Sequence, residues 1–81
     1  MIHRSKQVIQ AAILEAANGG ATKTRLISSG RLDYYVLAPY LKELLEVGML
    51  EYNAPEELYR TSTKGIDFLQ VYRQMVELAE I

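Results

Sequence analysis

Apolar residues recur every three or four positions along most of this chain, which is the spacing of one face of an α-helix. Four stretches show this pattern, and each begins at a residue whose side chain can cap a helix: Ser5, Thr22, Asp33, and either Ser62 or Thr63. Glycines follow the first and third stretches and favour helix ends there. The pattern predicts helices over residues 5–18, 22–29, 34–47 and 63–80.

Between the third and fourth helices the pattern changes to that of a β-hairpin over residues 49–61. Two short apolar runs flank Asn53-Ala54-Pro55-Glu56-Glu57, which has the composition of a turn. Residues 1–81 are therefore expected to form one α+β domain, mostly helical, in the order helix, helix, helix, hairpin, helix. Two helices joined by a tight turn form a helix-turn-helix unit, and a hairpin directly after it makes the unit winged.

Composition narrows the function further. The 81 residues include no cysteine and one histidine, so disulfides and thiolate metal sites are excluded and we expect no metal and no cofactor. The chain lacks a Ser-His-Asp set and a phosphate-binding glycine loop, which indicates a protein that is not an enzyme. No apolar run reaches the ~20 residues that cross a bilayer, and no signal peptide is recognisable, so we expect a cytoplasmic protein without a membrane partner.

The net charge of −1 conceals an uneven distribution. Residues 1–42 carry six Lys or Arg against two acidic residues, a net charge of +4, whereas residues 43–81 carry three against eight, a net charge of −5. The positive half could face phosphate groups, although solvated surface charge explains the same numbers.

Several motifs together resemble the archaeal winged helix-turn-helix regulators, a group that includes small chromatin-associated proteins. The resemblance rests on residues 22–27, 32–34, 40–41, 44–50, Tyr59 and 62–69, where a Leu-Leu-Glu-Val-Gly helix end, a hairpin and a Ser-Thr-Lys-Gly helix start follow one another. It implies duplex DNA as the partner, transcriptional regulation, and dimerisation through the last helix.

The candidate DNA contacts lie on the second helix, the turn that follows it, and the third helix. Phosphate contacts are expected from Lys23, Arg25 and Arg31, and the outward face of the recognition helix is expected to present Tyr35, Ala38, Pro39 and Lys42. Tyr34 is expected to pack beneath the turn.

Two features depart from the family pattern. Pro39 requires either a kinked helix or a helix whose regular part begins there. The hairpin carries Glu51, Glu56 and Glu57, which a phosphate backbone would repel. These features favour an alternative function, a winged helix repurposed for protein–protein contact.

The last helix has too many apolar residues for one face. A helix that is apolar on two sides must bury both. We expect one side to cover the core and the other to form a homodimer interface, with Arg73 and Glu77 paired at its margin. The alternative is a monomer whose last helix folds back over its own domain. The predicted interface residues are Leu69, Tyr72, Met75, Val76 and Ala79.

Overall fold

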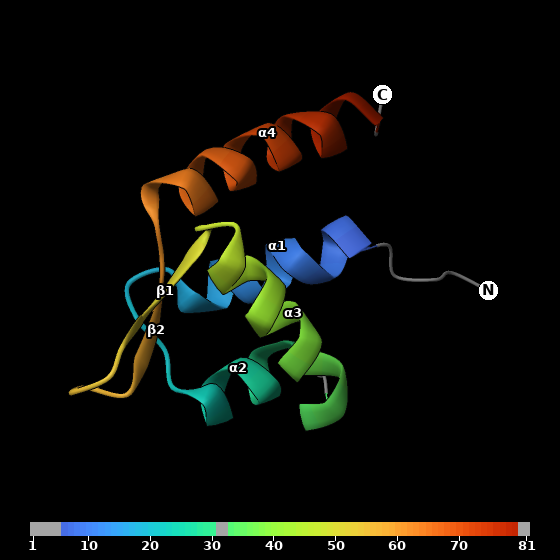
Figure 1. The fold of residues 1–81 in the computed structure, drawn as a ribbon. Helices are drawn as coiled ribbons and strands as arrows, with labels where there is room; N and C mark the ends of the chain where they lie inside the picture. The colour runs from blue at the N-terminus through green and yellow to red at the C-terminus, as the bar shows by residue number, and fades with distance from the viewer. Residues whose placement is uncertain (1–5, 31–32, 80–81) are drawn as a thin grey trace.

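The computed structural model describes residues 6–30 and 33–79 of the chain. Within these ranges the helices and strands follow one another in the predicted order, helix, helix, helix, hairpin, helix (Figure 1). The elements are α1 (Lys6–Ala17), α2 (Lys23–Gly30), α3 (Tyr34–Glu46), β1 (Leu50–Asn53), β2 (Leu58–Thr61) and α4 (Thr63–Ala79).

Side-chain caps start three of the helices where the sequence places suitable residues. The Asp33 carboxylate accepts a hydrogen bond of 2.9 Å from the backbone N–H of Val36 at the start of α3. The Thr22 hydroxyl oxygen accepts from the N–H of Arg25, and the Ser62 hydroxyl oxygen accepts from the N–H of Gly65, each at 3.2 Å. Such caps satisfy N–H groups that have no partner within the helix. Ser62, and not Thr63, is therefore the cap of α4; the predicted cap Ser5 lies outside the described residues.

Helix α3 runs without a break from Tyr34 to Glu46, with Pro39 inside it. The alternative in which the helix begins at Pro39 is therefore wrong, because the cap at Asp33 starts it more than a full turn earlier. The helix ends at Glu46 with Val47 as its C-cap, and Gly48 follows with a φ of +80°, a left-handed conformation that glycine adopts at little cost. The chain reverses at this glycine and enters β1.

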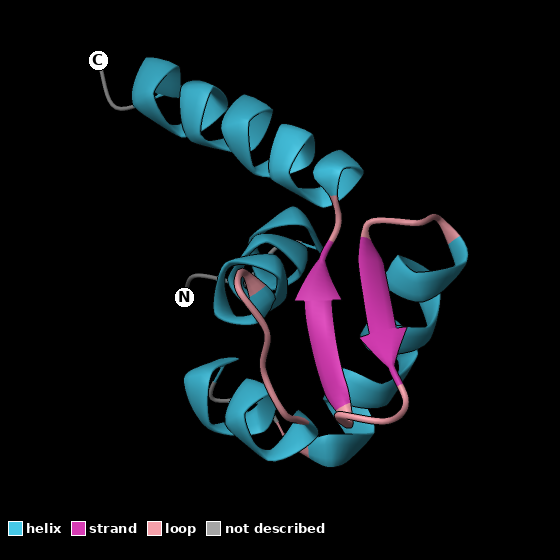
Figure 2. Cartoon of the chain, turned by 90° about the vertical axis from the view of Figure 1, so that its left-hand side faces the viewer, coloured by secondary structure: helices cyan, strands magenta, loops and turns pink. Residues whose placement is uncertain are grey.

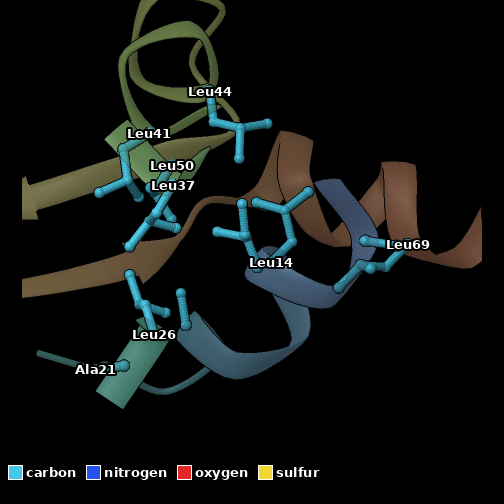
Figure 3. Packing of buried hydrophobic residues seen from close by; sticks show 11 residues of the cluster. Leu14, Ala21, Leu26, Leu37, Leu41, Leu44, Leu50 and Leu69 are labelled. Carbon is cyan, nitrogen blue, oxygen red and sulfur yellow. The ribbon is translucent and has the colours of Figure 1, made fainter. Parts of the chain in front are cut away.

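The core lies between α1 and the elements that surround it. Figure 3 shows leucines from α1, α2, α3, β1 and α4 pointing toward one another. One buried polar contact crosses this core: the Thr61 hydroxyl donates to the carbonyl oxygen of Leu14 at 2.5 Å. The largest fully buried side chains are Ile13, Leu14, Leu26, Leu37, Leu44, Leu50 and Leu69.

The two strands pair antiparallel in a register that runs from Leu50 opposite Thr61 to Asn53 opposite Leu58. The link between α1 and α2 pairs with β2 over a single antiparallel bridge, in which Ala21 and Tyr59 exchange two backbone hydrogen bonds of 2.8 Å. Figure 2 shows this link descending beside the hairpin before it enters α2. The hairpin is thereby fixed relative to the start of α2.

Helix α4 leaves the hairpin and lies at the end of the molecule opposite α2 (Figures 1 and 2). Its contact with the core is narrow, since Gly65 and Leu69 are its buried residues. None of the described helices is long and apolar enough to cross a membrane.

Candidate nucleic-acid interface

Three segments lie at the end of the molecule away from α4: the first turn of α2, the first turn of α3, and the tip of the hairpin, with α2 between the other two (Figure 1). We call this the distal end and define it by residues 22–25, 33–36 and 54–57. A hollow separates the start of α2 from the hairpin. It is lined by Thr22, Lys23, Thr24, Tyr52, Glu56, Glu57 and Tyr59.

Two of the predicted phosphate contacts are exposed at the distal end. The Lys23 ammonium group lies 5.2 Å from the centre of the Tyr34 ring, a cation–π contact that joins the start of α2 to the start of α3. Arg25 is exposed in the same turn of α2, and Lys42 is exposed further along α3. Arg31 lies outside the described residues.

Two tyrosines open α3 at the distal end. The Tyr35 side chain is 85% exposed, and its ring meets that of Tyr34 edge to face, with the centroids 6.0 Å apart. The expectation that Tyr34 packs beneath the turn was wrong: the residue is 48% exposed, because its ring faces Lys23 at the surface and not the core. Val36, which the sequence analysis did not select, is also exposed, at 40%.

The outward face of α3 matches the predicted set except at one position. Tyr35, Pro39 and Lys42 are exposed, one turn apart along the helix, whereas Ala38 is half-buried. Ala38 lies three positions before the buried Leu41, on the side of α3 that borders the core. The face therefore presents an aromatic ring, a proline ring and one cation.

The hairpin tip places negative charge beside Lys23. Glu56 and Glu57 are both exposed and line the hollow opposite α2. The tip is ordered locally, because the Asn53 amide donates to the Glu56 carboxylate at 2.8 Å and accepts from the Glu56 N–H at 3.2 Å. Glu57 has a φ of +54°, a left-handed conformation that closes the turn.

At the opposite end, α4 exposes an apolar stripe formed by Val71, Met75 and Leu78, which are 57%, 53% and 71% exposed. Leu69, predicted as an interface residue, is instead 2% exposed in the core of its own chain. Tyr72 is half-buried against that core and Val76 is half-buried as well, whereas Met75 and Ala79 are exposed. The free face of α4 is thus rotated relative to the predicted seam. Val71 and Met75 also border an apolar groove lined by Gln7, Phe68 and Tyr72.

Ion pairs tie both ends of α1 to neighbouring helices. Arg73 of α4 pairs with Glu15 of α1 at 3.2 Å, so the predicted pairing of Arg73 with Glu77 is replaced by a contact between helices. Lys6 of α1 pairs with Glu43 of α3 at 2.8 Å. The hydrogen bond and the charge of Glu43 raise the pKa of Lys6 above its ordinary value of 10.5. Among the described residues, no three His, Asp or Glu side chains gather as a metal site would require.

Helices α2 and α3 are joined by a short connection, and the β1–β2 hairpin follows them directly. The family model of the winged helix-turn-helix matches residues 3–80, nearly the whole chain. The chain belongs to the winged helix-turn-helix family. In this winged helix-turn-helix protein, α2 and α3 form the helix-turn-helix and the β1–β2 hairpin is the wing, which confirms the predicted fold.

A solved structure has the same fold. The crystal structure of Sso10a-2, a DNA-binding protein from Sulfolobus solfataricus, superposes with a TM-score of 0.87 at 24% sequence identity. The alignment covers 95% of this chain and 83% of that chain. No curated protein matches this winged helix-turn-helix protein.

Proposed function

We propose that this winged helix-turn-helix protein binds duplex DNA as a homodimeric transcriptional regulator. The observation that carries the proposal is that the first turns of α2 and α3 and the wing tip lie at the same end of the molecule, with Lys23 and Arg25 exposed on α2 between the other two. Family membership supports it, as does the similarity in fold to a protein described as DNA-binding.

In this proposal α3 enters the major groove with its first turns against the base edges, as the second helix of a helix-turn-helix does. Lys23 and Arg25 contact phosphates beside the groove, and Lys42 approaches the backbone further along α3. These three cations from the described residues are few, and the wing glutamates oppose them. We therefore expect weak to moderate affinity with a shallow salt dependence, because each neutralised phosphate adds about one unit to the slope.

The test is a titration of mixed-sequence duplex DNA with the full chain at several salt concentrations. Replacing Lys23 and Arg25 by alanine should weaken binding and reduce the slope by about two units. Arg73→Ala is the matched control, because it removes a cation from the α1–α4 side and should leave both quantities unchanged. Absence of binding by the wild type at low salt would end the proposal.

The homodimer part of the proposal rests on α4. The stripe of Val71, Met75 and Leu78 has the i, i+4, i+7 spacing of one helix face, and the core of the same chain does not cover it. A small domain that leaves such a face open gains stability by association. A second copy would cover it and place two α3 helices to read a symmetric site.

Sedimentation equilibrium tests the dimer. Met75→Glu should yield monomers, because a carboxylate would have to be buried in the apolar seam. Gln70→Glu adds the same charge to the polar face of α4 and should leave the dimer intact. Wild-type protein that stays monomeric at micromolar concentration would contradict this part of the proposal.

A second candidate function is supported by the acidic wing. Exposed Glu56 and Glu57 suit contact with a basic protein surface better than contact with phosphate. A winged helix repurposed for protein–protein interaction would bind duplex DNA weakly or not at all. The same titration separates the two functions: absence of binding even at low salt favours this candidate, whereas binding that depends on Lys23 and Arg25 favours the first.

A further inference from the structure

The first turn of α3 is apolar where a DNA-reading helix usually carries polar side chains. Side chains read guanine and adenine edges mainly through Arg, Lys, Asn and Gln, and read thymine through carbon contact with its C5-methyl group. Between Tyr34 and Glu46, α3 contains no Arg, Asn, Gln, Ser or Thr, and its one cation, Lys42, lies in the third turn. Apart from the tyrosine hydroxyls, the first turn of α3 therefore offers carbon surface, and carbon contact is the means by which a side chain recognises thymine.

The geometry of the first turn suits such contacts. Tyr35 projects almost fully into solvent at the distal end, Val36 follows it, and Pro39 continues the Tyr35 face one turn later. Tyr35 is held in place by its edge-to-face contact with Tyr34, whose ring is in turn covered by Lys23. Because Tyr35 already makes this ring contact before binding, less side-chain entropy is lost when it meets a base edge.

We propose that Tyr35 and Val36 read thymine methyl groups in the major groove, so that this protein selects A·T-rich duplexes by apolar contact. The inference rests on the proposed DNA binding and names the base that is read. Lys23 and Arg25 hold the phosphates without regard to sequence, and the aromatic first turn supplies the discrimination. The α2 cations complement the negative charge of the duplex. The carbon surface of α3 complements the shape and the apolar character of the thymine methyl groups.

The experiment compares an A·T-rich duplex with the same sequence in which deoxyuridine replaces thymidine, using fluorescence anisotropy of the labelled DNA. Deoxyuridine lacks only the methyl group. Affinity should fall about fourfold for each contacted methyl group that is removed, which is the effect of burying one such group. Conversely, 5-methylcytosine places a methyl group at the same groove position, so methylating a G·C-rich duplex should raise affinity.

Variants assign the effect to residues. Tyr35→Ala should abolish most of the thymine preference, whereas Tyr35→Phe should keep it because the ring remains. The exposure of Tyr35 means that both variants should keep the fold, which circular dichroism checks. Arg25→Ala is the contrasting control: as a proposed phosphate contact on α2 it should weaken binding to both duplexes equally and leave their ratio unchanged.

The outcomes separate this inference from the function on which it rests. Equal affinity for thymine and uracil duplexes would overturn the methyl readout while DNA binding stands. Binding to neither duplex at low salt would overturn DNA binding itself. A preference that survives in Tyr35→Ala and Val36→Ala would overturn the assignment to these residues. So would a Tyr35→Ala variant that changes self-association but not the thymine-to-uracil ratio, because the turn would then be a protein contact.

Discussion

Thr61 and Gly65 hold the base of the wing against the rest of the domain, each through contacts of a few atoms. The Thr61 hydroxyl donates to the carbonyl oxygen of Leu14 in the last turn of α1, where helix carbonyls lack partners within the helix. Gly65 allows the first turn of α4 to approach the backbone of Met49 and the methyl group of Thr61. Neither contact follows from periodicity, because both join segments far apart in the chain.

Removing the Thr61 hydroxyl should destabilise the fold. In Thr61→Val the shape is kept but the buried Leu14 carbonyl loses its donor, so the free energy of unfolding should fall by about 1–3 kcal/mol. Urea denaturation measures it. Thr61→Ser is the matched control, because it keeps the donor and loses only a methyl group, at about 0.8 kcal/mol. A valine variant as stable as the wild type would show that the hydrogen bond contributes nothing.

Adding a methyl group at Gly65 should also destabilise the fold. A Cβ at this position would overlap the carbonyl oxygen of Met49 and the methyl group of Thr61, and the backbone oxygen cannot move aside easily. Alanine favours helix by about 1 kcal/mol over glycine, but the overlap should prevail and lower unfolding free energy by about 1–3 kcal/mol. Gln70→Ala, at an exposed position of α4, should change stability little. An unchanged or raised thermal midpoint for Gly65→Ala would show that α4 can shift freely.

At the scale of elements, helical spacing and capping residues were sufficient to predict the order of helices and hairpin. They were less informative about which face of a helix stays free. Both Leu69 and Met75 fit an apolar seam on α4, and only the position of α1 beneath the helix decides that Leu69 is buried. Tyr34 and Arg73 illustrate the same limit, because their partners Lys23 and Glu15 lie on other helices.

Pro39 supplies a test within α3. Because the helix is continuous through Pro39, the ring removes the N–H that would donate to the Tyr35 carbonyl and crowds that oxygen. The side chain is exposed, so Pro39→Ala should lose little packing and raise the free energy of unfolding by about 1–3 kcal/mol. A thermal melt measures this, with Lys42→Ala as a control on the same helix. A midpoint at or below that of the wild type would mean that the proline is accommodated without loss.

At the scale of the whole molecule, the two ends differ in chemistry. The distal end combines Lys23 and Arg25 with the glutamates of the wing, whereas the α4 end is an apolar stripe with a polar margin. The uneven charge seen along the sequence is thus partly mixed in space, since acidic residues of the second half stand beside cations of the first. The sequence was sufficient to select the candidate cations. Their closeness to Glu56 and Glu57 could not be predicted from it, because that depends on where the hairpin places the wing tip relative to α2.

The wing glutamates should therefore limit DNA binding from within the distal end. Replacing both Glu56 and Glu57 by glutamine removes two negative charges, while the amide oxygen introduced at the first of these positions can still accept from Asn53. Affinity for duplex DNA at low salt should rise about threefold to tenfold, and the gain should shrink as salt screens the charges. The matched control is Asp67→Asn with Glu77→Gln, which removes the same charge from exposed positions of α4 and should leave affinity nearly unchanged. Equal gains in the two double variants would mean that net charge alone governs binding, and no gain in either would place the wing away from the DNA.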